Sequence, residues 1–179
     1  VSRLLTDAGR DHVVLDRGGV AERWRSERWD SLHLLTPNWM TRLPGWCYTG
    51  PDPDGYMSAS ELVRHLERYA ASFHAPIVPD TNVLEISATR SPGCARFCVV
   101  TDSGTWHARH VVVATGPHGR PHLPGGLSGI SSRVEVLTAS SYRNPDTFPP
   151  GGVLVVGASA SGVQIADELS STGREVAIA

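Results

Sequence analysis

One pattern near the carboxyl end most constrains the fold of this chain. An apolar run over residues 153–156 is followed by a short glycine-bounded turn and then by an amphipathic stretch that ends at Leu169. The order of apolar strand, tight turn and helix is typical of a dinucleotide-binding unit in a parallel α/β sheet. The turn residues are Gly157, Ala158, Ser159, Ala160, Ser161 and Gly162.

The two glycines of this turn have separate expected roles. Gly157 permits a sharp exit from the strand, and Gly162 lets the helix pack closely on the strand. The amino end of the helix then offers free N–H groups and a positive dipole to a pyrophosphate. Ser159 replaces the middle glycine of the motif and narrows the approach to the phosphates. The alternative interpretation is an ordinary strand-to-helix turn that binds nothing.

Asp16 is the second candidate nucleotide contact. It ends the strand-like segment 11–16, and in dinucleotide-binding folds an acid about 20 residues after the first glycine binds the adenosine ribose. Counting back from Asp16 places such a glycine turn about four residues before Val1, and counting on from Gly157 places the second acid at about residue 177 or beyond. We therefore expect that the chain is cut at both ends. The residue that would distinguish NADH from NADPH then falls at or just beyond the last residue of the sequence, so the sequence does not decide between them. A solvated acid at a strand end is the alternative for Asp16.

Composition excludes several classes of protein. The 179 residues carry a formal net charge of −2 without runs of like charge, so we expect no nucleic-acid partner. The longest apolar stretches, 111–114 and 153–156, fall far short of the ~20 residues of a membrane span, so we expect no membrane and a cytoplasmic protein. Three cysteines without a CxxC pair predict reduced structural thiols and no metal site.

The remaining chain predicts mixed secondary structure. Ser58 and Glu61 have capping-box spacing before a helix of about 15 residues, whereas the segment 20–57 is an irregular, Trp- and Pro-rich excursion. Turn signals at Ser91-Pro-Gly and Asp102-Ser-Gly separate three strand-like runs that predict an antiparallel meander. These runs are 82–89, 96–101 and 106–115, and a Pro/Gly block at 149–152 marks a domain boundary.

These motifs, in this order, resemble the flavin-containing monooxygenase group of flavoproteins with two dinucleotide-binding domains. The landmarks are Asp11-His-Val-Val-Leu-Asp16-Arg17, Trp29-Asp-Ser-Leu-His-Leu-Leu-Thr-Pro37, Leu43-Pro-Gly45, Val111-Val-Val-Ala-Thr-Gly116, Tyr142-Arg-Asn-Pro145 and the glycine turn. The resemblance implies a Rossmann-like FAD-binding domain with an antiparallel β-meander over residues 1–150. Residues 151–179 would begin a Rossmann-like NAD(P)-binding domain, and the glycine turn would bind NADPH, with NADH not excluded.

The resemblance also implies roles for particular residues. Asp16, with Arg17 beside it, would hold the FAD ribose, and Trp24 would lie in the loop that approaches the flavin. Val83 would contact adenine through its backbone. Ala114, Thr115 and Gly116 match the family's link between domains.

The family's monooxygenase fingerprint is matched only at Tyr142, because Ser132, Val134 and Thr138 stand at its other positions. The expected function is an FAD-dependent oxidoreductase, a monooxygenase that uses NAD(P)H and O2 to oxygenate a small organic substrate. The alternatives are a flavin-dependent reductase without oxygenation and a non-catalytic fragment. Asp30 is considered as a catalytic candidate without an assigned role, and the oligomeric state is not predicted.

Overall fold

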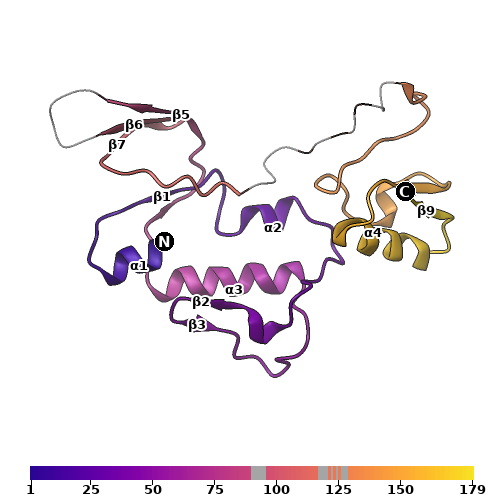
Figure 1. Cartoon of the computed structure of the whole chain (residues 1–179), viewed down its shortest axis with the longest axis horizontal. Helices are drawn as coiled ribbons and strands as arrows, with labels where there is room; N and C mark the ends of the chain where they lie inside the picture. The colour runs from indigo at the N-terminus through magenta and orange to yellow at the C-terminus, as the bar shows by residue number, and fades with distance from the viewer. Residues whose placement is uncertain (90–95, 117–120, 122, 124, 126–128) are drawn as a thin grey trace. The chain divides into compact units, whose positions relative to one another are not determined.

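The computed structural model describes residues 1–89, 96–116, 121, 123, 125 and 129–179 (Figure 1). The chain forms two compact units. The first comprises Val1–Glu22, Pro44–Trp46 and the described part of His65–Gly119. The second comprises Arg23–Leu43, Cys47–Arg64 and the described part of Arg120–Ala179. Helices and small sheets occur in both, which confirms the predicted α/β class.

The first unit contains one parallel strand pair and one antiparallel sheet. Strand β1 (Val14–Leu15) pairs in parallel with β4 (Ile77–Val78). The predicted meander is confirmed as the three-stranded sheet β5-β6-β7, whose strands are Val83–Ala88, Phe97–Thr101 and Gly104–Ala108. The Asp102-Ser-Gly turn joins β6 to β7, while the Ser91-Pro-Gly turn lies outside the described residues.

The strand expected over 106–115 is wrong beyond Ala108, where β7 ends. Residues 109–116 are irregular, and Val112 and Val113 are 63% and 70% exposed. A strand needs a partner for its backbone N–H and C=O groups. In the part of the chain that the structure describes, no strand pairs with residues 111–115. The expected strand 11–16 is likewise reduced to β1, and β4 is its one strand partner among the described residues.

Helix α3 (Ala59–Ser72) confirms the predicted capping box. The Ser58 backbone N–H donates to Oε2 of Glu61 at 2.8 Å, and the Glu61 N–H donates to Oγ of Ser58 at 3.3 Å. This reciprocal pair satisfies donors that the first helical turn leaves without a partner. Leu62 and Val63 are buried, as the helical spacing of the apolar residues requires.

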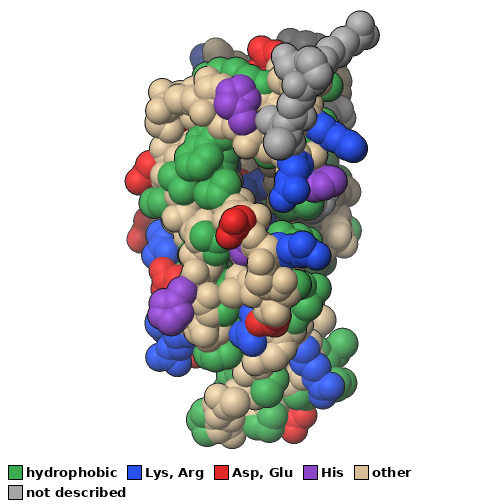
Figure 2. All heavy atoms as spheres, turned by 90° about the vertical axis from the view of Figure 1, so that its left-hand side faces the viewer, with side chains coloured by type: hydrophobic (Ala, Val, Ile, Leu, Met, Phe, Trp, Pro, Cys, Tyr) green, Lys and Arg blue, Asp and Glu red, His purple; other side chains and the backbone are tan. Residues whose placement is uncertain are grey.

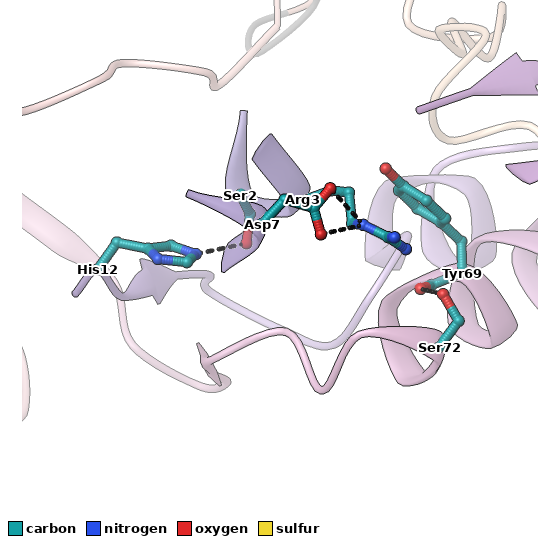
Figure 3. A network of polar contacts seen from close by, with 6 residues as sticks. All are labelled: Ser2, Arg3, Asp7, His12, Tyr69 and Ser72. Carbon is teal, nitrogen blue, oxygen red and sulfur yellow. Dashed lines mark hydrogen bonds and ion pairs between the residues drawn. The ribbon is translucent and has the colours of Figure 1, made fainter. Parts of the chain in front are cut away.

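Aromatic and charged side chains join the carboxyl half of α3 to helix α1 (Ser2–Asp7) in the first unit. Arg3 donates from Nε to both carboxylate oxygens of Asp7 at 2.9 Å, and its guanidinium lies 5.6 Å from the centre of the Phe73 ring. Figure 3 shows Arg3 beside Asp7 and Tyr69, with Ser2 hydrogen-bonded to His12 at 2.8 Å. Arg3 thus connects the short α1 to Phe73, the residue that directly follows α3.

The irregular excursion of the sequence contains short elements rather than a sustained helix or strand. Its elements are α2 (Glu22–Ser26), the 3-10 helix η1 (Asn38–Met40), β2 (Arg42–Leu43) and β3 (Trp46–Cys47), with β2 paired to β3. Asn38 organises this segment because its buried side chain donates to the Asp52 carbonyl and accepts from the Met57 N–H, both at 2.9 Å.

The hydrophobic core of the second unit lies around helix α4 (Ala160–Ser171). Strand β8 (Val153–Val155) pairs in parallel with β9 (Val176–Ile178), and the side chains of Val153, Val155 and Val176 pack against this core. The 3-10 helix η3 (Pro145–Thr147) precedes β8. The buried core residues are Trp29, Leu32, Ala59, Tyr142, Ile165 and Leu169.

No helix in the described ranges is both long and apolar enough to cross a membrane. On the face drawn in Figure 2, acidic, basic and histidine side chains are interspersed among apolar ones.

Candidate functional site

The glycine turn between β8 and α4 has the backbone geometry that its sequence predicts. Gly157 has a φ of +109°, which L-residues with side chains rarely adopt. Its N–H donates to the Ala179 carbonyl at 2.8 Å, which ties the start of the turn to the residue after β9. A Cβ added at Gly162 would collide with the Gly157 carbonyl oxygen. Both positions therefore require glycine for a physical reason.

The first turn of α4 is open to solvent. Ser159 is the N-cap in an extended conformation, and no side chain among the described residues donates or accepts a capping hydrogen bond there. Residues 157–161 are exposed, and their side chains are no larger than serine. The first N–H groups of a helix have no partner within the helix, so this end can bind an anion. The small side chains leave space in front of it.

Helix α4 is fixed by contacts on its opposite side. Leu169 is fully buried and Ile165 nearly so, within the core that also includes Trp29. Gln164 adds a reciprocal pair of amide hydrogen bonds, accepting from the His33 N–H at 3.4 Å and donating to the His33 carbonyl at 3.2 Å. The helix that carries the candidate anion site is therefore held by a segment more than 100 residues earlier in the chain.

Tyr142, the retained fingerprint residue, is a core residue of the second unit. It is 2% exposed, stacks on Phe148 at 5.6 Å between ring centroids, and donates to Oε2 of Glu168 at 2.7 Å. Burial raises the pKa of Tyr142 well above its ordinary value of 10, and the hydrogen bond to Glu168 raises it further. These contacts hold α4 against the core of the second unit. The neighbouring fingerprint position Thr138 forms a hydroxyl cluster with Ser140 and Ser141.

Asp30 has hydrogen bonds that tie two loops together. Its N–H donates to the Arg143 carbonyl at 2.8 Å, and its Oδ2 accepts from Nδ2 of Asn144 at 2.7 Å. Arg143 in turn donates to the Arg28 carbonyl at 2.8 Å. The Asp30 carboxylate thus already serves a structural contact, and its catalytic role stays a hypothesis.

Asp16 lies directly after β1, at the carboxyl end of the parallel pair β1–β4. Ligands of open α/β sheets bind beyond the carboxyl ends of strands. Its Oδ1 accepts from the Gly18 N–H at 3.1 Å, and its carbonyl accepts from the Thr81 N–H at 2.8 Å. Thr81 stands two residues before Val83, so hydrogen bonds bring the Asp16 loop and the start of β5 together.

The other predicted site residues are distributed over both units. Arg17 follows Asp16 in the first unit, where Ala114, Thr115 and Gly116 lie in exposed, irregular chain, with a φ of +73° at Gly116. Trp24 belongs to the second unit, as the glycine turn does. Its ring lies 5.2 Å from the guanidinium carbon of Arg28, a cation–π contact within one short segment. Their roles toward a cofactor stay predictions.

Sequence reasoning missed the residues that hold the site in place. Gln164, Glu168 and Thr81 carry contacts that fix α4 or Asp16. One signal was available, because Gln164 and Glu168 are four residues apart and share a helix face. The described residues contain no group of three or more His, Cys, Asp or Glu side chains arranged to hold a metal ion.

Parallel strand pairs, a glycine turn and an acid after a strand together define an α/β protein of the Rossmann-like class. The model of one family, described as pyridine nucleotide-disulphide oxidoreductase, matches residues 4–179. The chain belongs to this family.

Relatives of this chain include oxidoreductases and monooxygenases. It is 41% identical over 164 residues to an uncharacterized CzcO-like oxidoreductase of Geobacillus kaustophilus, covering 92% of this chain and 45% of the relative. It is 30% identical over 171 residues to the probable indole-3-pyruvate monooxygenase YUCCA1 of Arabidopsis thaliana, covering 94% of this chain and 41% of the relative. The chain thus spans less than half the length of these curated relatives.

The fold matches that of a flavin-containing monooxygenase from Stenotrophomonas maltophilia, with a TM-score of 0.84 and 30% identity. The match covers 99% of this chain and 52% of that one. The resemblance to the flavin-containing monooxygenase group and the Rossmann-like fold class are thereby confirmed.

Proposed function

We propose that this protein is an FAD-dependent monooxygenase that uses NADPH and O2 to oxygenate a small organic substrate. The observation that carries the proposal is the glycine turn, whose Gly157 and Gly162 leave the first turn of α4 open to a pyrophosphate. Family membership supports a pyridine nucleotide, and the match to a flavin-containing monooxygenase supports the flavin.

The residues present fit two nucleotide cofactors. At α4, the exposed amides and small side chains of 157–161 suit the pyrophosphate of a nicotinamide nucleotide. At β1, Asp16 would accept hydrogen bonds from the ribose hydroxyls of FAD through its carboxylate. Val83 would contact adenine through its backbone, and Ala114, Thr115 and Gly116 would let the chain pass close to the cofactor. Arg17 would lie beside Asp16 at the ribose, and Trp24 would lie in the loop that approaches the flavin.

The contribution of this chain to the reaction is binding and orientation. The flavin, when bound, supplies the redox chemistry. The core contacts of Ile165 and Leu169 hold α4, so that its amino end stays in one place while a nucleotide binds. Overall, NADPH is oxidised and O2 is reduced, with one oxygen atom entering the substrate and the other leaving as water. NADH remains an alternative donor, and the cytoplasm is the compartment that we expect.

The experiment is to purify the protein expressed from its native gene and to record its absorbance spectrum and its rate of NADPH oxidation. We expect bound flavin, O2-dependent NADPH oxidation and incorporation of isotopically labelled O2 into a product. Parallel assays with NADH determine the nucleotide preference. A preparation without flavin affinity would refute the proposal. Undiminished turnover with an artificial acceptor in the absence of O2 would support a reductase instead.

A further inference from the structure

A second loop packs against the Asp16 loop at the carboxyl end of the pair β1–β4. The segment Pro79–Thr81 directly follows β4, just as Asp16 directly follows β1. The strands are parallel, with Leu15 opposite Val78, so both loops leave the sheet at the same edge. This is the edge at which ligands bind in open α/β sheets.

Three main-chain hydrogen bonds hold the Asp16 loop against the end of β4 and the loop that follows it. The Asp16 N–H donates to the Val78 carbonyl at 3.1 Å, which continues the ladder by one residue. The Thr81 N–H donates to the Asp16 carbonyl at 2.8 Å, and the Asp80 N–H donates to the Gly18 carbonyl at 3.3 Å. Since the Gly18 N–H also donates to Oδ1 of Asp16, the backbone and one carboxylate oxygen of Asp16 are all held in this arrangement.

The loop after β4 has an unusual backbone conformation, which the Thr81 hydroxyl stabilises. Asp80 has a φ of +50°, in the left-handed region that residues with a Cβ seldom occupy. Thr81 is 3% exposed, and its Oγ1 donates to the Pro79 carbonyl at 3.0 Å, which closes the loop across Asp80. The buried hydroxyl thereby stabilises the backbone that presents the N–H groups of Asp80 and Thr81 to the Asp16 loop.

We infer that Pro79–Thr81 is a positioning loop for the Asp16 carboxylate, with the Thr81 hydroxyl as the group that fixes it. The inference rests on the proposed function, in which Asp16 binds the ribose of FAD. In the proposed FAD site, Thr81 does not contact the nucleotide. It acts through the backbone of Asp16, by keeping that carboxylate oriented toward the ribose before the cofactor arrives, so that less freedom is lost on binding.

The test compares FAD with FMN, which lacks the adenosine ribose. In the protein expressed from its native gene, Thr81→Val removes the hydroxyl and keeps the branched shape. We expect the Kd for FAD to rise about fivefold or more and the Kd for FMN to stay within about twofold, because about 1 kcal/mol of orientation corresponds to a factor of about five. Thr81→Ser, which retains the hydroxyl, should restore FAD affinity and gives an answer even if the valine variant folds poorly.

A double-mutant cycle separates positioning from general stability. Asp16→Asn should weaken FAD binding on its own, and adding Thr81→Val to it should cause little further loss, since the two residues act on one contact. Thr172→Val is the control in the second unit, because the Thr172 Oγ1 also donates to a backbone carbonyl, that of Leu169 at 2.7 Å. It should leave the FAD-to-FMN affinity ratio unchanged.

The outcomes distinguish a failure of the proposed function from a failure of the inference about Thr81. A wild-type protein that binds no FAD would overturn the proposed function together with this inference. A wild-type protein that binds FAD, loses affinity in Asp16→Asn and keeps it in Thr81→Val would overturn the inference alone. Equal weakening of FAD and FMN binding by Thr81→Val would also overturn it, because the hydroxyl would then act on the whole fold rather than on the ribose contact.

Discussion

The phenolic hydroxyl of Tyr142 donates a 2.7 Å hydrogen bond to Oε2 of Glu168, which joins the loop before η3 to helix α4. The tyrosine is buried and the glutamate is half-buried, so the bond lies partly out of water. A hydrogen bond to a carboxylate contributes more than one between neutral groups. The contact therefore helps to hold the helix whose amino end forms the candidate anion site.

Tyr142→Phe should lower the free energy of unfolding by about 1–2 kcal/mol, because the ring remains packed while the hydrogen bond to Glu168 is lost. Urea unfolding followed by tryptophan fluorescence measures the change. Tyr56→Phe is the control, since Tyr56 is 52% exposed and its change should stay within about 0.5 kcal/mol. Equal stability of the wild type and Tyr142→Phe would show that the bond contributes nothing.

The same tyrosine predicts a difference at alkaline pH. Its folded pKa is raised above the ordinary value of 10, so its contribution to stability is complete below pH 10 and is lost as pH rises through the folded pKa. The wild type should therefore lose stability more steeply above pH 10 than Tyr142→Phe does. Unfolding midpoints measured at a series of pH values from 8 upward test this. Parallel pH profiles of the two proteins would contradict the expectation.

The capping box of α3 predicts a second loss of stability, this time in acid. Hydrogen bonds from the backbone and side chain of Ser58 lower the pKa of Glu61 below its ordinary value of 4.5. The contribution is present above pH 4.5 and is lost as pH falls through the folded pKa. Ser58→Ala should cost about 1 kcal/mol at neutral pH and less below pH 4. A loss that is independent of pH would rule out the carboxylate as the partner.

The burial of His65 leads us to expect a further loss of stability as pH falls below 6.5. Burial, followed by the charge of Arg68, lowers the pKa of His65 below its ordinary value of 6.5, so the folded protein favours the neutral ring. Stability from this group is present above pH 6.5 and is lost as pH falls through the folded pKa. His65→Gln should flatten the pH dependence of unfolding as pH falls below about 6.5. A histidine titration by NMR checks the direction directly.

Gly162→Ala should disturb the glycine turn itself, since the new methyl group would meet the Gly157 carbonyl oxygen. We expect a cost of about 1–3 kcal/mol in the free energy of unfolding and a weaker affinity for NADPH. Gly129→Ala is the matched control in the same unit, because its Cβ would have no neighbour within 4 Å. Unchanged NADPH affinity in a folded Gly162→Ala protein would argue against the turn as the binding site.

Features that depend on neighbouring residues were predictable from the sequence, and those that depend on distant partners were not. The cap at Ser58 and the turn at Gly157 are determined by local geometry, and both were confirmed. The strand predicted over Val111–Thr115 was wrong. An apolar β-branched run favours a strand, but a strand also needs a neighbouring strand to pair with, and none pairs with these residues in the described part of the chain. The same holds for Thr81, whose sequence context gives no sign that its N–H donates to Asp16.

The hydrogen bonds between His33 and Gln164 bridge 131 positions of the chain. A contact between residues this far apart in the chain requires the closure of a long loop, which costs conformational entropy. Such contacts therefore form later in folding than local turns do. On a ribosome, the segment around Trp29 emerges well before α4, and its packing partners on this helix are absent until α4 is synthesised. The glycine turn between β8 and α4 is therefore held in place only after these two distant segments of the second unit have met.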